Sequence, residues 1–143
     1  MIAITDRRED PGSAAAGGPE DPGDPSNTRE PPTSKEVDDE IALEILRIHE
    51  ESYGGGAGVA QAIVTEGWVM VILDDLELLP NERFLLENGN ADTVMQVRSQ
   101  YQQAIRTTFS AAVERATGRS VVGFASTTSL EEPCFAAEIF KLE

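Results

Sequence analysis

The stretch Trp68-Val69-Met70-Val71-Ile72-Leu73 is the longest uninterrupted apolar run of the chain. It falls far short of the roughly 20 residues that a membrane-spanning helix needs, so we expect no segment that crosses a bilayer. Val59 to Thr65 precedes this run, and Glu66-Gly67 lies between the two, a pattern typical of a β-hairpin. Because the second strand is apolar throughout, we expect it to be central or covered on both faces. The side chains that we expect to form the middle of the core are Trp68, Val69, Val71, Ile72 and Leu73.

A helix is predicted before this hairpin. Thr33 and Glu36 form the Ser/Thr-x-x-Glu pattern that satisfies free amides at a helix start. Apolar residues then recur at three- and four-residue steps over about 36–52. The glycine-rich segment 54–58 cannot sustain the helix and leads into the hairpin.

Two helices and a second hairpin are predicted after it. Pro80 and Glu82 suit the first turn of a short helix over about 80–87. A long helix over about 91–117 carries an apolar stripe, and Gly118 follows it as a terminating glycine does. The stripe consists of Val94, Val97, Tyr101, Ile105, Phe109, Val113 and Ala116. The segments 120–127 and 134–142 complete the chain as a second hairpin.

This order predicts a two-layer α+β domain over residues 36–143, with about four mainly antiparallel strands packed against helices in the order α-β-β-α-α-β-β. Four apolar residues of the second hairpin, Phe124, Phe135, Ile139 and Phe140, do not all fall on one side of their strands, so apolar surface is expected to remain uncovered in a monomer. A homodimer would cover it. Residues 1–35 contain six of the eight prolines and few large apolar side chains, which predicts a disordered acidic tail.

The charge of the chain restricts its partners. Acidic residues outnumber basic ones 26 to 11, giving a net charge of −15. Such a surface repels phosphate backbones and anionic lipids, so we expect no nucleic acid and no direct insertion into a membrane. A protein partner is expected instead. The first ten residues lack the basic and apolar regions of a secretory signal, and the single cysteine fits a reducing compartment, so we expect the cytoplasm.

The inventory of reactive residues disfavours an enzyme. The one histidine, His49, lies at the edge of an apolar stripe, and Cys134 has no basic neighbour in sequence. We expect both to be structural. Asp74, Asp75 and Glu77 lack the spacing of a calcium loop, and no His or Cys lies beside them, so no metal or other cofactor is predicted.

Two further motifs have an alternative interpretation. The glycine-rich segment could cradle a phosphate, but no Lys-Ser/Thr pair follows it, and a connector is favoured. Arg98, Arg106 and Arg115 on the long helix could bind an anion, but surface ion pairs of the i,i+4 type are favoured.

Four segments of the chain, in their order and spacing, are similar to those of a known protein family. They are the glycine-rich segment before a hairpin, the strand Trp68 to Leu73 followed by Leu79-Pro80-x-Glu82, the long helix ending at Gly118-Arg119, and the closing strand 137–142. Across about residues 38–143 the chain resembles the MpsC family of small prokaryotic proteins, also called YbcI-like.

The resemblance implies an accessory component of a Na+-translocating, membrane-potential-generating system, whose transport work is done by separate membrane subunits. It marks Leu79, Pro80, Glu82, Gly118 and Arg119 as the interaction or family-motif positions. We therefore expect an accessory or regulatory binding protein. The alternative is a small-ligand-binding or self-associating domain unrelated to transport, with a ligand held between the glycine-rich segment and the Leu79-Pro80-x-Glu82 turn.

Overall fold

The computed structural model describes residues 31–143. The predicted tail therefore lies, up to residue 30, outside the described residues. The elements are α1 (Ser34–Tyr53), β1 (Ala57–Val64), β2 (Trp68–Leu76), α2 (Pro80–Glu87), α3 (Ala91–Thr117), β3 (Val121–Ser129) and β4 (Phe135–Leu142). This is the predicted α-β-β-α-α-β-β order, and the predicted α+β class is confirmed.

The four strands form one antiparallel sheet in the order β1-β2-β4-β3. Both predicted hairpins are present, and β2 of the first pairs with β4 of the second. The strand that the apolar run predicts to be central is therefore central. Val71 illustrates its position, because it lies opposite Ala62 on β1 and Glu138 on β4.

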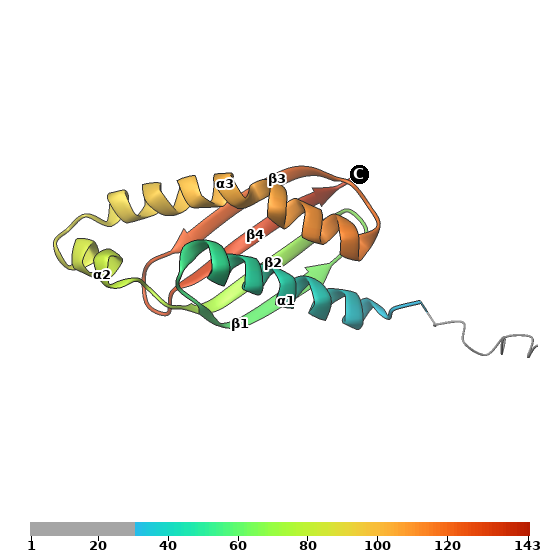
Figure 1. Cartoon of the computed structure of the whole chain (residues 1–143), viewed down its shortest axis with the longest axis horizontal. Helices are drawn as coiled ribbons and strands as arrows, with labels where there is room; N and C mark the ends of the chain where they lie inside the picture. Colours follow the sequence, from blue (N-terminus) through green and yellow to red (C-terminus); the bar gives the residue numbers. More distant parts are fainter. Residues whose placement is uncertain (1–30) are drawn as a thin grey trace, which may run out of the picture. The chain divides into compact units, whose positions relative to one another are not determined.

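Helices α1 and α3 both lie over the same face of this sheet (Figure 1). The core forms between them and the inward-facing side chains of the strands. Among the fully buried side chains are Ile41, Ile45, Val69, Val71, Leu73, Phe109, Val113 and Phe140. Burial of side chains of this size contributes about 2 kcal/mol each before the entropy of ordering is subtracted, so this layer is the main source of stability.

The opposite face of the sheet is not covered by any element of residues 31–143, which corrects the prediction that Trp68 and Ile72 lie in the middle of the core. The Trp68 side chain is 49% exposed and that of Ile72 is partly exposed, because alternate residues of β2 point to opposite faces. Val69, Val71 and Leu73 point toward the helices and are buried, whereas Met70 lies on the face with Trp68. We call this second surface the open sheet face.

Local signals explain where the helices begin and end. The Thr33 hydroxyl accepts from the Glu36 amide, and the Glu36 carboxylate accepts from the Thr33 amide, so the predicted capping box is present. Helix α1 is slightly longer than the predicted 36–52. Helices α2 and α3 have the predicted bounds, and α3 ends at Gly118, whose φ of 68° lies in the left-handed region.

The glycine-rich segment packs directly on the turn that precedes α2. A Cβ atom at Gly55 would lie 3.0 Å from the Glu77 carbonyl oxygen and 3.2 Å from Leu79 Cδ2. The Glu77 amide also donates to the Gly56 carbonyl at 2.9 Å. A residue without a side chain is needed for this approach, so the segment is a closely packed connector between α1 and β1.

Candidate functional site

The first turn of α2 places a carboxylate inside the protein. Pro80 occupies the first helical position, where its missing N–H costs nothing, and Glu82 follows two residues later. The Leu79 amide donates to Glu82 Oε1 at 2.9 Å, which closes the turn. Glu82 is only 5% exposed, so its charge needs further partners.

Arg98 of α3 is the principal partner. Its Nε and Nη2 atoms donate to Glu82 Oε2 at 2.6 Å and to Glu82 Oε1 at 2.9 Å, a two-pronged ion pair. Arg98 is 3% exposed, so the prediction of a surface pair is wrong for this residue. The interaction joins α2 to α3 across a sequence separation of 16 residues, which no i,i+4 pattern anticipates.

Tyr53, the last residue of α1, extends the pair to a third helix. Its hydroxyl donates to Glu82 Oε2 at 2.8 Å, and the Arg98 guanidinium lies 4.4 Å from its ring centroid. The Tyr53 ring also stacks with His49 and meets Tyr101 edge to face at 4.8 Å. We call Tyr53, Glu82 and Arg98 the Glu82 cluster.

The protonation states follow from burial and from these bonds. Burial alone would raise the pKa of Glu82, but the donors on Arg98, Leu79 and Tyr53 outweigh it and hold the pKa below its usual value. Burial and the bond to Glu82 raise the pKa of Tyr53. Burial, followed by the Arg98 charge, lowers the pKa of His49 to about 4. At neutral pH the Glu82 carboxylate is therefore ionised, whereas Tyr53 and His49 are neutral.

A pocket of about 130 Å³ opens beside the Glu82 cluster, between α2 and α3. It is lined by Tyr53, Leu79, Asn81, Glu82, Leu85, Val94, Val97 and Tyr101. Val97 and Tyr101, which belong to the predicted apolar stripe of α3, are 41% and 43% exposed. We call this feature the α2–α3 pocket. Its wall is mostly apolar, and its one carboxylate is already saturated by donors.

The structure separates the five residues that the sequence marks. Leu79 and Glu82 line the α2–α3 pocket and Pro80 begins α2. Gly118 and Arg119 lie beyond the other end of α3, about 30 Å along the helix from Arg98 at 1.5 Å per residue. There Arg119 donates to the carbonyls of Glu66 and Glu143, which ties the first hairpin turn to the end of the chain. These two residues hold the fold together at a different place.

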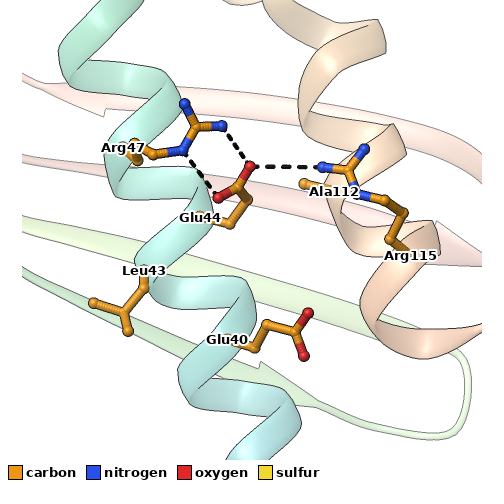
Figure 2. Close-up of a pocket in the computed structure, with 6 residues that line it drawn as sticks. All are labelled: Glu40, Leu43, Glu44, Arg47, Ala112 and Arg115. Carbon is orange, nitrogen blue, oxygen red and sulfur yellow. Dashed lines mark hydrogen bonds and ion pairs between the residues drawn. The ribbon is translucent and has the colours of Figure 1, made fainter. Parts of the chain in front are cut away.

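A second hollow, of about 420 Å³, lies between α1 and α3 (Figure 2). The Glu44 carboxylate accepts from Arg47 on its own helix and lies 3.5 Å from Arg115 of α3. Arg115 therefore forms a surface ion pair, but its partner lies on another helix and not four residues away on α3. Arg106 lies 6.0 Å from the Phe124 ring centroid. Exposed ion pairs of this kind contribute roughly 0 to 1 kcal/mol to the stability of a protein. The Glu44 carboxylate neutralises part of the positive charge of Arg47 and Arg115.

Sequence reasoning also missed Glu138. It lies on β4 facing the helices, is fully buried, and has no hydrogen-bond partner of good geometry for either carboxylate oxygen. Burial raises its pKa to about 7, against a smaller opposing effect of the Ser126 hydroxyl. Its position along the strand could have revealed this burial, because side chains two residues apart share one side of a strand. Ala136, Phe140 and Leu142 lie on the same side as Glu138 and are buried too.

The two candidate reactive residues are both buried. His49 is 6% exposed and stacks on Tyr53, as expected of a structural histidine. Cys134 is 1% exposed, burial raises the pKa of its thiol, and the thiol donates to the Leu130 carbonyl at 3.4 Å. Within residues 31–143 no group of three or more His, Cys, Asp or Glu side chains comes together in a way that could hold a metal ion.

One of the comparisons with known proteins identifies a family that the chain matches. In the described part of the chain, no helix is both long and apolar enough to span a membrane. No curated protein and no solved structure matches the chain. The family described as "Na+-translocating membrane potential-generating system (MpsC)" matches residues 33–143, which is the whole of the domain from the capping box of α1 to the last residue. The chain therefore belongs to the MpsC family.

Proposed function

We propose that this protein is a non-catalytic accessory component of a Na+-translocating, membrane-potential-generating system. It acts in the cytoplasm by binding a protein subunit of that system. Family membership over residues 33–143 supports the link to such a system. The observation that carries the binding role is the α2–α3 pocket, an apolar hollow with a rigid floor and an exposed apolar rim.

The size of the pocket indicates what it accepts. A volume of about 130 Å³ is close to the roughly 150 Å³ of an apolar cavity that takes up one benzene molecule. It is well below the roughly 300–1,000 Å³ of pockets that hold drug-sized ligands. One aliphatic or aromatic side chain of a partner protein fits this space, as the anchor residues of protein interfaces do.

The floor of the pocket is suited to recognition and not to proton transfer. Glu82 accepts four hydrogen bonds from Arg98, Leu79 and Tyr53, and its pKa is lowered. A general base needs a pKa near the working pH and a free lone pair directed at a substrate. The cluster instead fixes α2 against α1 and α3, so that the pocket is present before a partner arrives.

The partner segment is expected to be basic around its anchor. The chain carries a net charge of −15, and the charge of Arg98, which is paired with the pocket residue Glu82, is neutralised by it. Complementary charge would accelerate the encounter and weaken with salt.

The second candidate is a small-ligand-binding domain. The hollow between α1 and α3 favours it by size, since its volume of about 420 Å³ lies in the range of ligand pockets. A thermal-shift screen of nucleotides and metal ions tests this candidate, because a ligand that binds only the native state must raise its stability. A ligand that raises the melting temperature would favour this function over protein binding.

The binding role is tested by co-purification from native membranes. We would compare the tagged full chain with Val97→Arg, which fills the rim of the α2–α3 pocket. Val122→Arg, the same change at an exposed position of β3 that lines neither hollow, is the matched control. We expect Val97→Arg to reduce recovery of a membrane transport subunit about tenfold or more, and Val122→Arg to leave it unchanged. Equal recovery with both variants, or no membrane subunit with the wild-type chain, would contradict the proposal.

A further inference from the structure

The open sheet face is an apolar surface that the described residues leave uncovered. By strand register it comprises fifteen positions, three on β1 and four on each of the other strands. Val59, Ile63, Trp68, Met70 and Phe135 on this face are between 36% and 53% exposed. Ile72 and Ile139 lie between them and are partly exposed. A contiguous patch of this kind indicates an interface.

The charge on this face differs from the charge on the rest of the molecule. Only Asp74 and Lys141 among the fifteen positions are charged, whereas 26% of the whole chain is. Their charges cancel, so the face is neutral on a chain of net charge −15. Two identical acidic molecules repel each other through most contacts, and a neutral face is where they can approach at the least electrostatic cost.

The two charges also make the face complementary to itself. Lys141 lies opposite Trp68 at one end of the β2–β4 pair, and its Nζ atom is 5.1 Å from the Trp68 ring centroid. Asp74 lies opposite Phe135 at the other end. A two-fold axis in the plane between two such faces, perpendicular to the strands, places Lys141 of each copy over the Asp74 end of the other. An axis parallel to the strands places like charges together.

We propose that two copies of this chain stack through their open sheet faces about a two-fold axis perpendicular to β2 and β4. Sheets that pack face to face keep their strands within about 30° of alignment, which this axis permits. The interface is isologous, as in most homodimers. It uses a different surface from the α2–α3 pocket, so the dimer and the proposed function can fail independently.

The area of the face bears on the strength of the dimer. Four strands that are eight or nine residues long and spaced about 4.8 Å apart cover roughly 1,000 Å² on two copies together. This is near the lower limit of specific interfaces, so a micromolar dissociation constant is expected.

The single tryptophan of the chain reports on this interface directly. Trp68 is the only Trp, and it lies on the open sheet face. We would measure mass by sedimentation and tryptophan emission on the same samples of the full chain, from low to high micromolar concentration. The proposal predicts a shift from monomer to dimer mass together with a blue shift of the emission.

Three outcomes of this measurement overturn the proposal. One is a monomer at every concentration. Another is a dimer whose tryptophan emission equals that of the monomer, which would place the contact elsewhere. The third is emission that is blue-shifted in the monomer and independent of concentration, which would mean that residues 1–30 of the same chain cover the face.

Charge reversal tests the orientation of the two copies. Lys141→Glu and Asp74→Lys each replace two attractive pairs with two repulsive ones, and each should raise the dissociation constant about tenfold. The double variant should restore wild-type dimerisation. Lys35→Glu is the matched control, because Lys35 is the other lysine of the chain and lies exposed at the start of α1.

Two results would exclude this arrangement. If the double variant is as weak as the singles, the two-fold axis is wrong. If Lys35→Glu weakens the dimer as much as Lys141→Glu, net charge and not the pair is responsible. Met70→Glu, at an exposed central position, tests the face without using either charge: it should abolish the dimer with an unchanged far-UV circular dichroism spectrum, and a retained dimer overturns the proposal.

Discussion

Two carboxylates lie in the interior, and their surroundings favour opposite charge states. Glu82 is surrounded by donors and has a lowered pKa, whereas Glu138 has no hydrogen-bond partner of good geometry and has a pKa raised to about 7. Burial acts on both in the same direction. Their pKa values differ because Glu82 accepts hydrogen bonds from Arg98, the Leu79 amide and Tyr53.

Removing Arg98 tests the Glu82 cluster. Arg98→Met leaves a buried carboxylate without its counter-ion, which typically costs about 3–5 kcal/mol of unfolding free energy. Arg106→Met, the same change at an exposed position of the same helix, should cost under about 1 kcal/mol. Urea denaturation measures both. The double variant Glu82→Leu/Arg98→Met should recover much of the loss, and a single-variant cost no larger than that of Arg106→Met would contradict the account.

Glu138 should make stability fall as pH rises. Its pKa is raised in the folded state to about 7 from the ordinary glutamate value of 4.5, so the native protein binds more protons than the unfolded chain between these values. The stability lost across that window is about 3 kcal/mol, at about 1.4 kcal/mol per tenfold change in the protonation constant. His49, whose pKa is lowered to about 4, acts oppositely below pH 6.5.

Comparison with Glu138→Gln isolates this effect. The glutamine variant keeps the shape of the side chain and cannot ionise, so its stability relative to wild type should rise by about 3 kcal/mol from pH 4.5 to pH 8. Denaturation curves over this range measure the difference. A difference that does not change with pH would show that Glu138 titrates normally.

At the scale of elements, local signals were sufficient for most of the fold. The predicted α2 and α3 bounds agree with the structure because Pro80, the apolar stripe of α3 and Gly118 act within one or two turns. The hairpins follow from short apolar runs and their turns. The contact between α2 and α3 could not be predicted, because no pattern in one sequence says that residues 82 and 98 meet.

The sequence also could not predict the open sheet face. The run that begins at Trp68 is apolar at every position, so the period of two that separates an inner from an outer face is absent. Only the placement of α1 and α3 decides that Val69, Val71 and Leu73 are buried and that Trp68 is not. The α2–α3 pocket was missed for a similar reason, since Val97 and Tyr101 fit the stripe of a fully packed helix.

The left-handed conformation of Gly118 at the end of α3 can be tested by substitution. Gly118 has a φ of 68°, whereas Gly67 does not have a φ in this region, and a Cβ added at either would meet nothing within 4 Å. Ala at Gly118 should therefore cost about 1 kcal/mol through backbone strain alone. Ala at Gly67 should be neutral or slightly stabilising. Thermal unfolding measures both, and equal effects would mean that the left-handed conformation is not responsible.

At the scale of the whole molecule, the surfaces differ in charge and polarity. The helical side carries the surface ion pairs of Arg47 and Arg115 with Glu44, the open sheet face is neutral and apolar, and the α2–α3 pocket lies between two helices. A protein with two independent apolar surfaces can hold a second copy on one and a different partner on the other. This arrangement suits an accessory component that joins other subunits.

The domain should not depend on residues 1–30 for its stability. The structure describes the chain from residue 31, and the family match begins at residue 33. The melting temperature of residues 31–143 alone should lie within about 2 °C of that of the full chain. Scanning calorimetry compares the two. A fall of more than about 5 °C would mean that the preceding residues stabilise the domain.

The proposed binding role is tested most directly by photo-crosslinking inside cells. A photoreactive amino acid at position 97, on the rim of the α2–α3 pocket, should crosslink to a membrane subunit of a Na+-translocating system. The same group at position 122, on the exposed surface of β3, should give no such product. Crosslinks to that subunit from both positions, or from neither, would contradict recognition through the pocket.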